Sequence, residues 1–200
     1  MMNASAKGVL PFQRGRAWLL PAMSAVLLAV AGWGSGRAGG TAAPADGGAD
    51  EPLELKMPDS LRMRHEGFHA DFVKATKEGG NVGEAARSIK KLAEAHFAKA
   101  KEAFSPLGLL SRLAAGEVTP AMREAIGKAE RLRAALPQIR RDHGELVTGL
   151  ERLADSAKAE GKTDYARFAE QLTLHIGEEE EVLYPAALLV GEYLKRRLDK

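Results

Sequence analysis

The chain of 200 residues contains no cysteine. Disulfide bonds, zinc sites with thiolate ligands, iron–sulfur clusters, covalently attached haem and lipoprotein anchors all require cysteine, so each of them is excluded. A metal site in this protein would have to use other donors, such as imidazole and carboxylate groups. With 45% hydrophobic residues, the chain is long enough to bury one core, and its length favours a single folded domain.

The chain also lacks an excess of charge of one sign. Its 29 basic and 27 acidic side chains are interspersed, and the formal net charge is +2. Removing residues 1–31, whose charged side chains are Lys7, Arg14 and Arg16, lowers the net charge by three, to −1. Because proteins that bind nucleic acid carry a basic patch or stripe, we expect no nucleic-acid partner.

Residues 1–31 have the pattern of a secretory signal peptide. Three basic residues precede an apolar run over residues 17–33, and Ala29-Val30-Ala31 has the small-x-small pattern of a cleavage site. Pro21 and Gly32 interrupt the run, which is shorter than the about 20 apolar residues that span a bilayer. We therefore favour cleavage, with no stable membrane insertion, over the alternative of an uncleaved N-terminal anchor. In both cases we expect export to the periplasm or another extracytoplasmic space.

A flexible linker is predicted over residues 32–57. From Gly34 to about Glu51 the chain is dominated by glycine, alanine and proline, and large apolar residues are almost absent. This composition is typical of a flexible tether. The folded domain is then expected over residues 58–200.

Helix start and stop signals divide the folded domain. Pro58, Asp59 and Ser60 begin a first helix, predicted over about residues 59–78, which Gly79-Gly80 ends. In the next segment an asparagine at position 81 and a glutamate at position 84 have the spacing of a capping box for a second helix.

Further signals define the later helices. Thr119-Pro120 opens another segment, and Gly161 with Thr163 separates the last two long helices. Proline removes a backbone hydrogen bond and clashes with the preceding turn, so each internal proline is expected to kink or break a helix. These internal prolines are Pro106, Pro137 and Pro185. Four main helices with short extensions result.

Residues spaced three and four apart indicate one buried stripe on each helix. The first two stripes comprise Leu61, His65, Phe68, His69 and Phe72, and then Ile89, Leu92, His96, Ala100 and Ala103. The last two comprise Leu136, Ile139, His143, Leu146, Leu150 and Leu153, and then Tyr165, Phe168, Leu172, His175, Glu179 and Val182. Amphipathic helices with short connections pack side by side, so we predict an all-α fold, an antiparallel up-down four-helix bundle.

An internal repeat supports two matching helical hairpins. The segment LRMRHEGF around His65 aligns with IRRDHGEL around His143, and AHFAKAKEAFSPL around His96 aligns with LHIGEEEEVLYPA around His175. The two histidines are 31 residues apart in the first half and 32 apart in the second. Hairpins paired about a pseudo-twofold axis would place these four histidines in one layer of the bundle.

The histidines on these stripes predict a metal site. A buried polar group without a partner costs roughly 2–7 kcal/mol in transfer terms, and one shared cation would give partners to several such groups at once. A single histidine of this kind is usually a hydrogen-bonded residue at the core edge, but a repeated set with an acid in phase favours a metal centre. The predicted ligands are His65, His69, His96, His143, His175 and Glu179. Of the glutamates at positions 178–181, only Glu179 is in phase, and the others are assigned to the solvated face.

At these residues the chain resembles the hemerythrin-like family of cation-binding bundles. The resemblance covers roughly Leu61 to Leu194, and its sharpest element is HIGEEEEVLYPA, with His175, Glu179 and the Leu183-Tyr184-Pro185 ending. The resemblance implies a pair of non-haem iron ions, bridged by two carboxylates and a solvent-derived oxygen. It also implies a role in dioxygen binding, in oxygen or redox sensing, in iron handling or in nitric-oxide chemistry.

One position departs from the family pattern. The family has an acid four residues after the histidine of the second helix, whereas this chain has Ala100, followed by Lys101. One bridging carboxylate is therefore missing, so the number of iron ions is predicted as one or two. The family often carries an extra histidine on the third helix, where this chain has Val147. We hypothesise that His69 fills the mirror-related position and keeps five nitrogen donors.

These features predict an exported metal-binding protein that is not an enzyme. Its expected partners are a metal ion, implied to be iron, and a small diatomic ligand such as dioxygen or nitric oxide. One alternative is a non-haem iron oxidoreductase acting on peroxide or nitric oxide. Another is a degenerate bundle that has lost its metal and serves as an interaction module. The oligomeric state is left open.

Overall fold

The structure, a computed structural model, describes residues 53–200. These residues are all-helical and contain no strand, which confirms the predicted all-α class. The predicted signal peptide, residues 1–31, and most of the predicted linker lie outside the described residues. Among residues 53–200, no helix is both long enough and apolar enough to cross a membrane.

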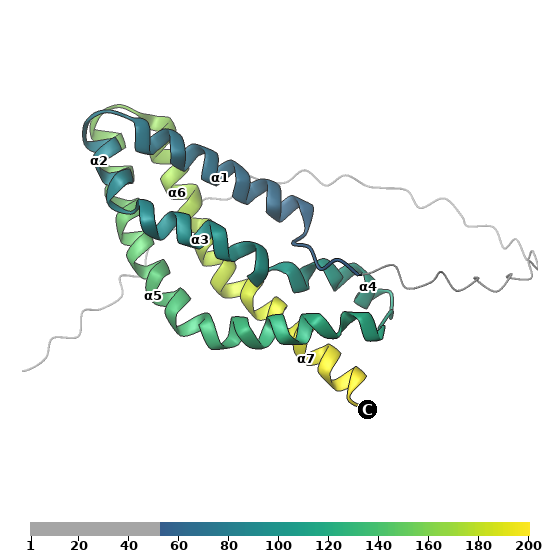
Figure 1. Ribbon diagram of the computed structural model, residues 1–200. Coiled ribbons are helices and arrows are strands. Elements are labelled where there is room, and N and C mark those ends of the chain that lie inside the picture. Colours follow the sequence, from purple (N-terminus) through teal and green to yellow (C-terminus); the bar gives the residue numbers. More distant parts are fainter. Residues whose placement is uncertain (1–52) are drawn as a thin grey trace, which may run out of the picture. The chain divides into compact units, whose positions relative to one another are not determined.

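The helices follow the predicted order, with short turns between them (Figure 1). The first half contains α1 (Asp59–Lys77), α2 (Gly80–Ser88), α3 (Lys90–Ala103), the 3₁₀ turn η1 (Ser105–Leu109) and α4 (Leu110–Ala114). The second half contains the 3₁₀ turn η2 (Pro120–Arg123), α5 (Glu124–Ala159), α6 (Thr163–Glu178), the π-helical turn η3 (Glu179–Leu183) and α7 (Tyr184–Leu198).

The turn after α1 confirms one sequence signal and corrects another. Helix α1 ends at Lys77, as the glycine pair predicts, and Gly80 has the left-handed φ of +69° that glycine accepts without strain. The predicted capping box is wrong, because Gly79 is the N-cap and Asn81 lies inside α2. The backbone N–H of Asn81 donates instead to Oε1 of Glu160 at 2.7 Å. A carboxylate from the α5–α6 turn thus satisfies a free amide at the start of α2.

The predicted second helix is divided into α2 and α3 by Ile89, whose φ and ψ are −107° and 7°. Ile89 is buried and faces Gly149 of α5. A Cβ atom at position 149 would lie 2.1 Å from Cγ2 of Ile89, so glycine is required for this close approach. The break in the helix and the glycine of α5 therefore belong to one packing contact.

The three internal prolines behave differently. Pro106 lies in the first turn of η1 and Pro185 in the first turn of α7, where the missing N–H is tolerated. Pro137, however, lies inside α5, a single helix of 36 residues, so of the expected kink or break the break does not occur. An interior proline costs about 3 kcal/mol or more. The buried Leu132 and Ile139 on either side hold α5 against its neighbours and offset that cost.

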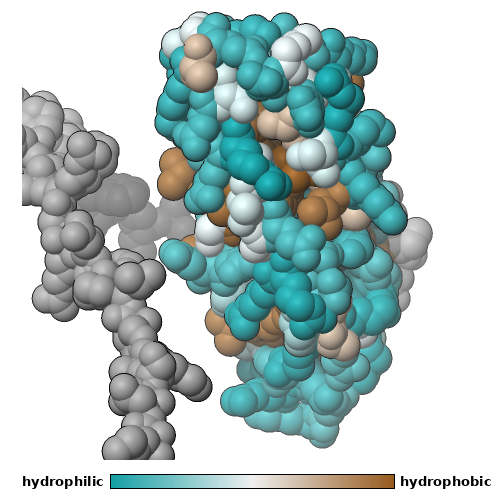
Figure 2. Space-filling view, turned by 90° about the vertical axis from the view of Figure 1, so that its left-hand side faces the viewer, coloured by the Kyte–Doolittle hydropathy of each residue, from teal (hydrophilic) through white to brown (hydrophobic). Residues whose placement is uncertain are grey.

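The core of the described residues consists mainly of two clusters, one on α1, α2, α3, α5 and α6 and the other on α1, α3, η1, α5 and α7. The Phe72 cluster contains Phe72, Ala93, Leu146, Leu150, Leu172 and Ile176 among others. The Phe104 cluster contains Met57, Leu61, Ala100, Phe104, Ile139 and Tyr184 among others. Hydrophilic residues cover most of the face in Figure 2, and hydrophobic residues gather around its middle. The helices are therefore amphipathic, as their stripes predict.

The last residues of the predicted linker pack against the helices. Met57 is buried in the Phe104 cluster, and Leu53 and Leu55 pack against a third cluster that includes Met122 and Leu194. A Cβ atom at position 108 would lie 2.2 Å from the carbonyl oxygen of Lys56. Residues 53–57 therefore have no regular secondary structure but belong to the packed domain.

Candidate metal centre

Four helices each contribute one buried histidine to the same layer. His65 comes from α1, His96 from α3, His143 from α5 and His175 from α6. Their exposed fractions are 9% or less. On α1, α3 and α5 the histidine lies between residues of the Phe72 cluster and residues of the Phe104 cluster, and after His175 of α6 the chain reaches the Phe104 cluster at Tyr184 of α7. The structure thus brings together the four histidines that the internal repeat predicts to share a layer.

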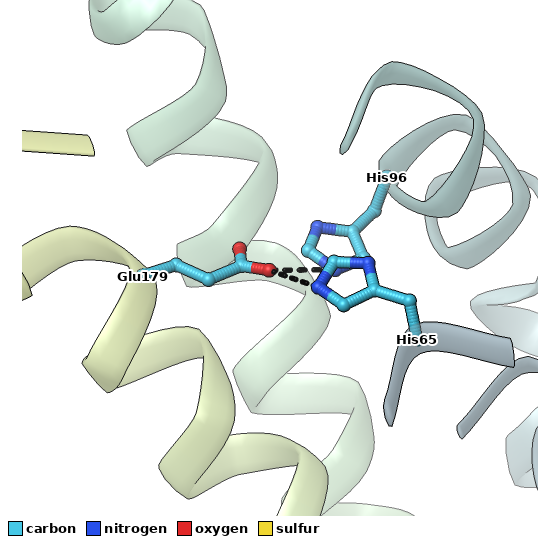
Figure 3. Close-up of side chains that lie close together, drawn as sticks. All are labelled: His65, His96 and Glu179. Atoms are coloured by element: carbon cyan, nitrogen blue, oxygen red, sulfur yellow. Dashed lines mark ion pairs between the residues drawn. The ribbon is translucent and has the colours of Figure 1, made fainter. Parts of the chain in front are cut away.

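Glu179 lies among these histidines and is fully buried. Its Oε1 is 3.1 Å from Nε2 of His65 and 3.3 Å from Nε2 of His175. Nε2 of His96 lies 3.6 Å from the same oxygen, and Figure 3 shows Glu179 reaching across to His65 and His96. The other oxygen, Oε2, is 3.5 Å from Nε2 of His143. One carboxylate therefore faces imidazoles from four helices.

The histidines also pair across the layer. Nε2 of His65 lies 2.8 Å from Nε2 of His175, and Nδ1 of His96 lies 3.2 Å from Nε2 of His143. Each pair joins one histidine of the first half of the chain to one of the second half. Nitrogen atoms at these separations share one proton at most in each pair, so the layer presents several lone pairs to a small volume.

Three buried polar atoms of this layer make no hydrogen bond: Nδ1 of His65, Nε2 of His96 and Oε1 of Glu179, whose short distances to Nε2 of His65 and of His175 are ion-pair contacts only. Buried polar groups are nearly always satisfied, so such atoms call for an explanation. Donor atoms of the same three residues lie within 4.8 Å of one another. A metal ion would use these lone pairs, and the donor set of imidazole and carboxylate suits a divalent transition metal. The residues present therefore fit a metal site.

The protonation states of the layer also suit a metal ion. Burial lowers the pKa of His96 to about 4, although the charge of Glu179 opposes this shift. Burial would raise the pKa of Glu179, but the imidazoles of His175 and His65 stabilise the carboxylate and hold its pKa at about 2. At neutral pH, His96 is thus uncharged and Glu179 is ionised, the forms that bind metal.

A π-helical turn brings Tyr184 to the centre. The sequence pattern predicts that Val182 continues the buried stripe, but Val182 is 56% exposed and Tyr184 is buried. The π turn η3 inserts one extra residue after Glu179, and each residue of a helix turns the chain by about 100°. The hydroxyl of Tyr184 donates to Oε2 of Glu179 at 3.2 Å, and burial raises the pKa of Tyr184.

Two carboxylates that were assigned by sequence to the solvated face are half-buried and also reach the centre, and Oε2 of one of them, Glu178, pairs with Nη1 of the exposed Arg64 at 2.5 Å as well. Oε1 of Glu180 lies 2.9 Å from Nδ1 of His143, and Oε2 of Glu178 lies 3.3 Å from Nδ1 of His175. Carboxylates in this position orient a ligating imidazole and raise its basicity. Their position beside a histidine within a run of acids is the signal that could have found them. Glu181 is exposed, as predicted.

The structure does not bring His69 into the layer. Its side chain is exposed, and its ring contacts the edge of Phe97 at a centroid distance of 5.3 Å. The hypothesis that His69 supplies a fifth nitrogen ligand is therefore wrong. The buried face of α1 continues from His65 to Phe72, and His69 lies outside it. Ala100, where an acid was expected, is buried in the Phe104 cluster.

Comparison of the chain with protein-family models, curated proteins and solved structures gave no match. The description of this centre therefore depends on the residues of the chain itself. Residues 53–200 are all-helical and contain a buried histidine–glutamate cluster that could hold a metal ion.

Proposed function

We propose that this chain is an exported hemerythrin-like protein that holds one or two non-haem iron ions and binds or senses dioxygen or another small ligand. The observation that supports this most directly is the buried layer of four histidines around Glu179, in which three donor atoms have no other partner. Two of these donors, Nε2 of His96 and Oε1 of Glu179, are 3.6 Å apart. Export is supported by the N-terminal sequence pattern alone.

The proposed architecture is an antiparallel four-helix bundle with a pseudo-twofold repeat of helical hairpins. Successive long helices pass the histidine layer in alternating directions. Helices α1 and α5 run from the Phe104 cluster to the Phe72 cluster, and α3 and the segment α6–α7 run the opposite way. The two cross-layer histidine pairs each join one hairpin to the other, which is the relation that a twofold axis would generate.

The donor set supports a metal ion, and the family resemblance supports iron. Imidazole binds iron, zinc and copper, whereas carboxylate oxygen is the harder donor that iron also accepts. The residues that would hold the metal are His65, His96, His143, His175 and Glu179. The two oxygens of Glu179 face different histidines, so one carboxylate serves the whole layer. Bound iron would supply a redox-active ion with a coordination position for a small ligand.

The other residues of the chain control the surroundings of that ion. The Phe72 and Phe104 clusters enclose the layer on both sides and exclude bulk water. Tyr184 keeps a proton on its hydroxyl next to Oε2 of Glu179. Glu178 and Glu180 hold the Nδ1 sides of His175 and His143, which leaves Nε2 of both rings directed toward Glu179. Ala100 contributes no carboxylate, so one coordination position of a bound ion would be left for an exogenous ligand.

The experiment that tests this function is metal analysis of the purified protein after iron loading. We expect one or two iron ions per chain in the wild type and loss of iron in Glu179→Ala. The matched control is Glu181→Ala, because Glu181 belongs to the same run of acids but is exposed. Absence of bound iron in the wild type, or equal retention by both variants, would contradict the proposal.

A second candidate function is an iron oxidoreductase that consumes peroxide or nitric oxide. The buried hydroxyl of Tyr184 beside Glu179 favours this candidate, because a positioned phenol can deliver a proton to a reacting oxygen. Consumption of peroxide by the iron-loaded wild type that is lost in Tyr184→Phe would support the enzyme. Iron binding without such consumption would leave the binding function.

A further inference from the structure

Two hollows in the described part of the chain touch the buried histidines. The first lies between α1 and α3, has a volume of about 290 Å³ and is lined in part by His65. The second lies between α3 and α5, has a volume of about 20 Å³ and is lined in part by His96 and His143. A water molecule needs about 10–15 Å³ of such volume. The second hollow thus admits about one water, whereas the first admits an ion with part of its hydration shell.

The hollow between α1 and α3 connects an exposed rim to a buried ligand. His65 is 6% exposed, and its Nδ1 is buried with no hydrogen-bond partner. The rim carries His69, Glu66 and Glu94, which are exposed and can donate to a cation, together with the basic side chains of Arg62 and Lys101. A set of possible ligands therefore leads from solvent to the first histidine of the buried layer.

His69 is the rim donor that ion pairs leave available. Glu66 pairs with Arg62 at 3.0 Å, and Glu94 pairs with Lys90 at 2.5 Å. His69 makes no hydrogen bond or ion pair within residues 53–200, and its ring lies edge-on to Phe97. A neutral imidazole is a good ligand for divalent transition metals. The position of His69 one turn from His65 thus suits a transient ligand better than a permanent one.

Phe97 separates His69 from the buried layer. Its ring centroid lies 5.3 Å from that of His69, 6.2 Å from that of His65 and 5.2 Å from that of His96, in each case edge-on. Phe97 is half-buried on α3 and lines the hollow, so a rotamer change of its ring would widen the path between the rim and the two buried histidines. Rotamer changes of this kind are far easier than separation of two packed helices.

From these observations we propose that the hollow between α1 and α3 is the entry route for the divalent metal ion, with His69 as its capture ligand. This inference rests on the proposed metal-binding function. The ion exchanges hydration water for the imidazole of His69, passes the ring of Phe97 and reaches His65 and then Glu179. No covalent or redox step is involved. The exposed His69, which does not belong to the permanent ligand set, acquires a role as a residue that speeds loading.

The test is the rate at which the metal-free full-length chain takes up Co²⁺, followed by absorbance after rapid mixing. Ala98→Trp fills the hollow from an exposed position, and His69→Ala removes the capture ligand. The matched control is Ala135→Trp, because Ala135 is also exposed and lines a hollow of about 150 Å³ that contains none of the buried histidines. Circular dichroism checks that each variant is folded.

We expect Co²⁺ uptake to be about tenfold slower in Ala98→Trp and several-fold slower in His69→Ala. Both variants are expected to bind the wild-type amount of Co²⁺ at the end. A tenfold slower rate corresponds to a barrier higher by about 1.4 kcal/mol. Ala135→Trp is expected to match the wild type. If the wild type takes up Co²⁺ and both test variants take it up as fast as the wild type, the route is overturned while metal binding stands. Slower loading in Ala135→Trp alone would also overturn it. If the wild type binds neither Co²⁺ nor iron, the function and the route both fall.

Discussion

The two halves of the histidine layer each contain two imidazoles but differ in their carboxylates. In the second half, Nδ1 of His143 and Nδ1 of His175 lie near Glu180 and Glu178, and the central Glu179 comes from the same segment. In the first half, Nδ1 of His65 and Nε2 of His96 have no partner. Ala100 occupies the position equivalent to Glu179, four residues after the histidine.

Because of this difference, the two halves have different roles in the centre. The second half supplies the negative charge and the orienting carboxylates, so its histidines are held in place before a metal ion arrives. The first half supplies two imidazoles that each keep a nitrogen without a hydrogen-bond partner, and the larger hollow opens onto it through His65. A repeat of histidines in the sequence has therefore produced one half that orients ligands and one half that admits an ion.

The largest expected effect comes from Ala100→Glu, which makes the first half resemble the second. A buried carboxylate without a cation is strongly destabilising, so we expect the metal-free variant to lose about 3–5 kcal/mol of unfolding free energy. Metal loading is expected to restore most of the loss, because the new carboxylate would face the ion. Urea denaturation with and without iron measures both quantities. Ala98→Glu, at an exposed position of the same helix, serves as the control and is expected to be close to neutral.

The next effect is the acid sensitivity that His96 gives to the metal-free protein. Burial lowers the pKa of His96 from 6.5 to about 4, so between these pH values the unfolded chain binds a proton that the folded chain does not. This contribution to stability is fully present above pH 6.5 and is lost as the pH falls toward 4. The shift corresponds to about 3 kcal/mol in unfolding free energy.

Denaturation curves recorded between pH 7 and pH 4 test this prediction. The slope of stability against pH is expected to become smaller in His96→Leu over this range and to stay unchanged in His69→Gln, because His69 is exposed. A wild type whose stability does not change between pH 6.5 and 4 would show that His96 is not a buried neutral imidazole.

The smallest effect concerns the outer carboxylates of the second half. Glu180→Ala and Glu178→Ala each remove a partner of a ligand imidazole, and we expect metal affinity to fall by about 10–100-fold in each. Competition with a chelator measures the affinity, and Glu181→Ala is the matched control. Unchanged affinity in both variants would mean that the halves of the layer do not differ in the way described.

Several features of the centre could be predicted from the sequence because they depend on spacing along one helix. The 3.6-residue period places His143 on the buried face of its helix together with Leu146 and Leu150, whichever neighbours pack there. The matching intervals of the repeat likewise place the histidines at similar depth. The same rule puts Glu179 one turn after His175, and all of these side chains are buried.

Features at the edge of a buried face could not be predicted in this way. A residue four positions on is rotated by about 40° from the first, so His69 lies at the edge of the stripe that contains His65. Whether such a residue is covered depends on the opposite helix, and at this point Phe97 fills the space. Glu178 and Glu180 lie on either side of Glu179. Whether these two side chains are covered likewise depends on their neighbours, the rings of His175 and His143.

The sequence by itself determined the helical class of the described residues, the helix order and the four histidines with Glu179 that face inward. These follow from the periodicity of apolar residues and from the residues that start and stop helices, both of which act locally. The tertiary structure alone decided which lone pairs stay unpartnered, that Tyr184 replaces Val182 through the π turn, and where the layer opens toward solvent. Those outcomes depend on distances between side chains of different helices, which no spacing along a single helix specifies.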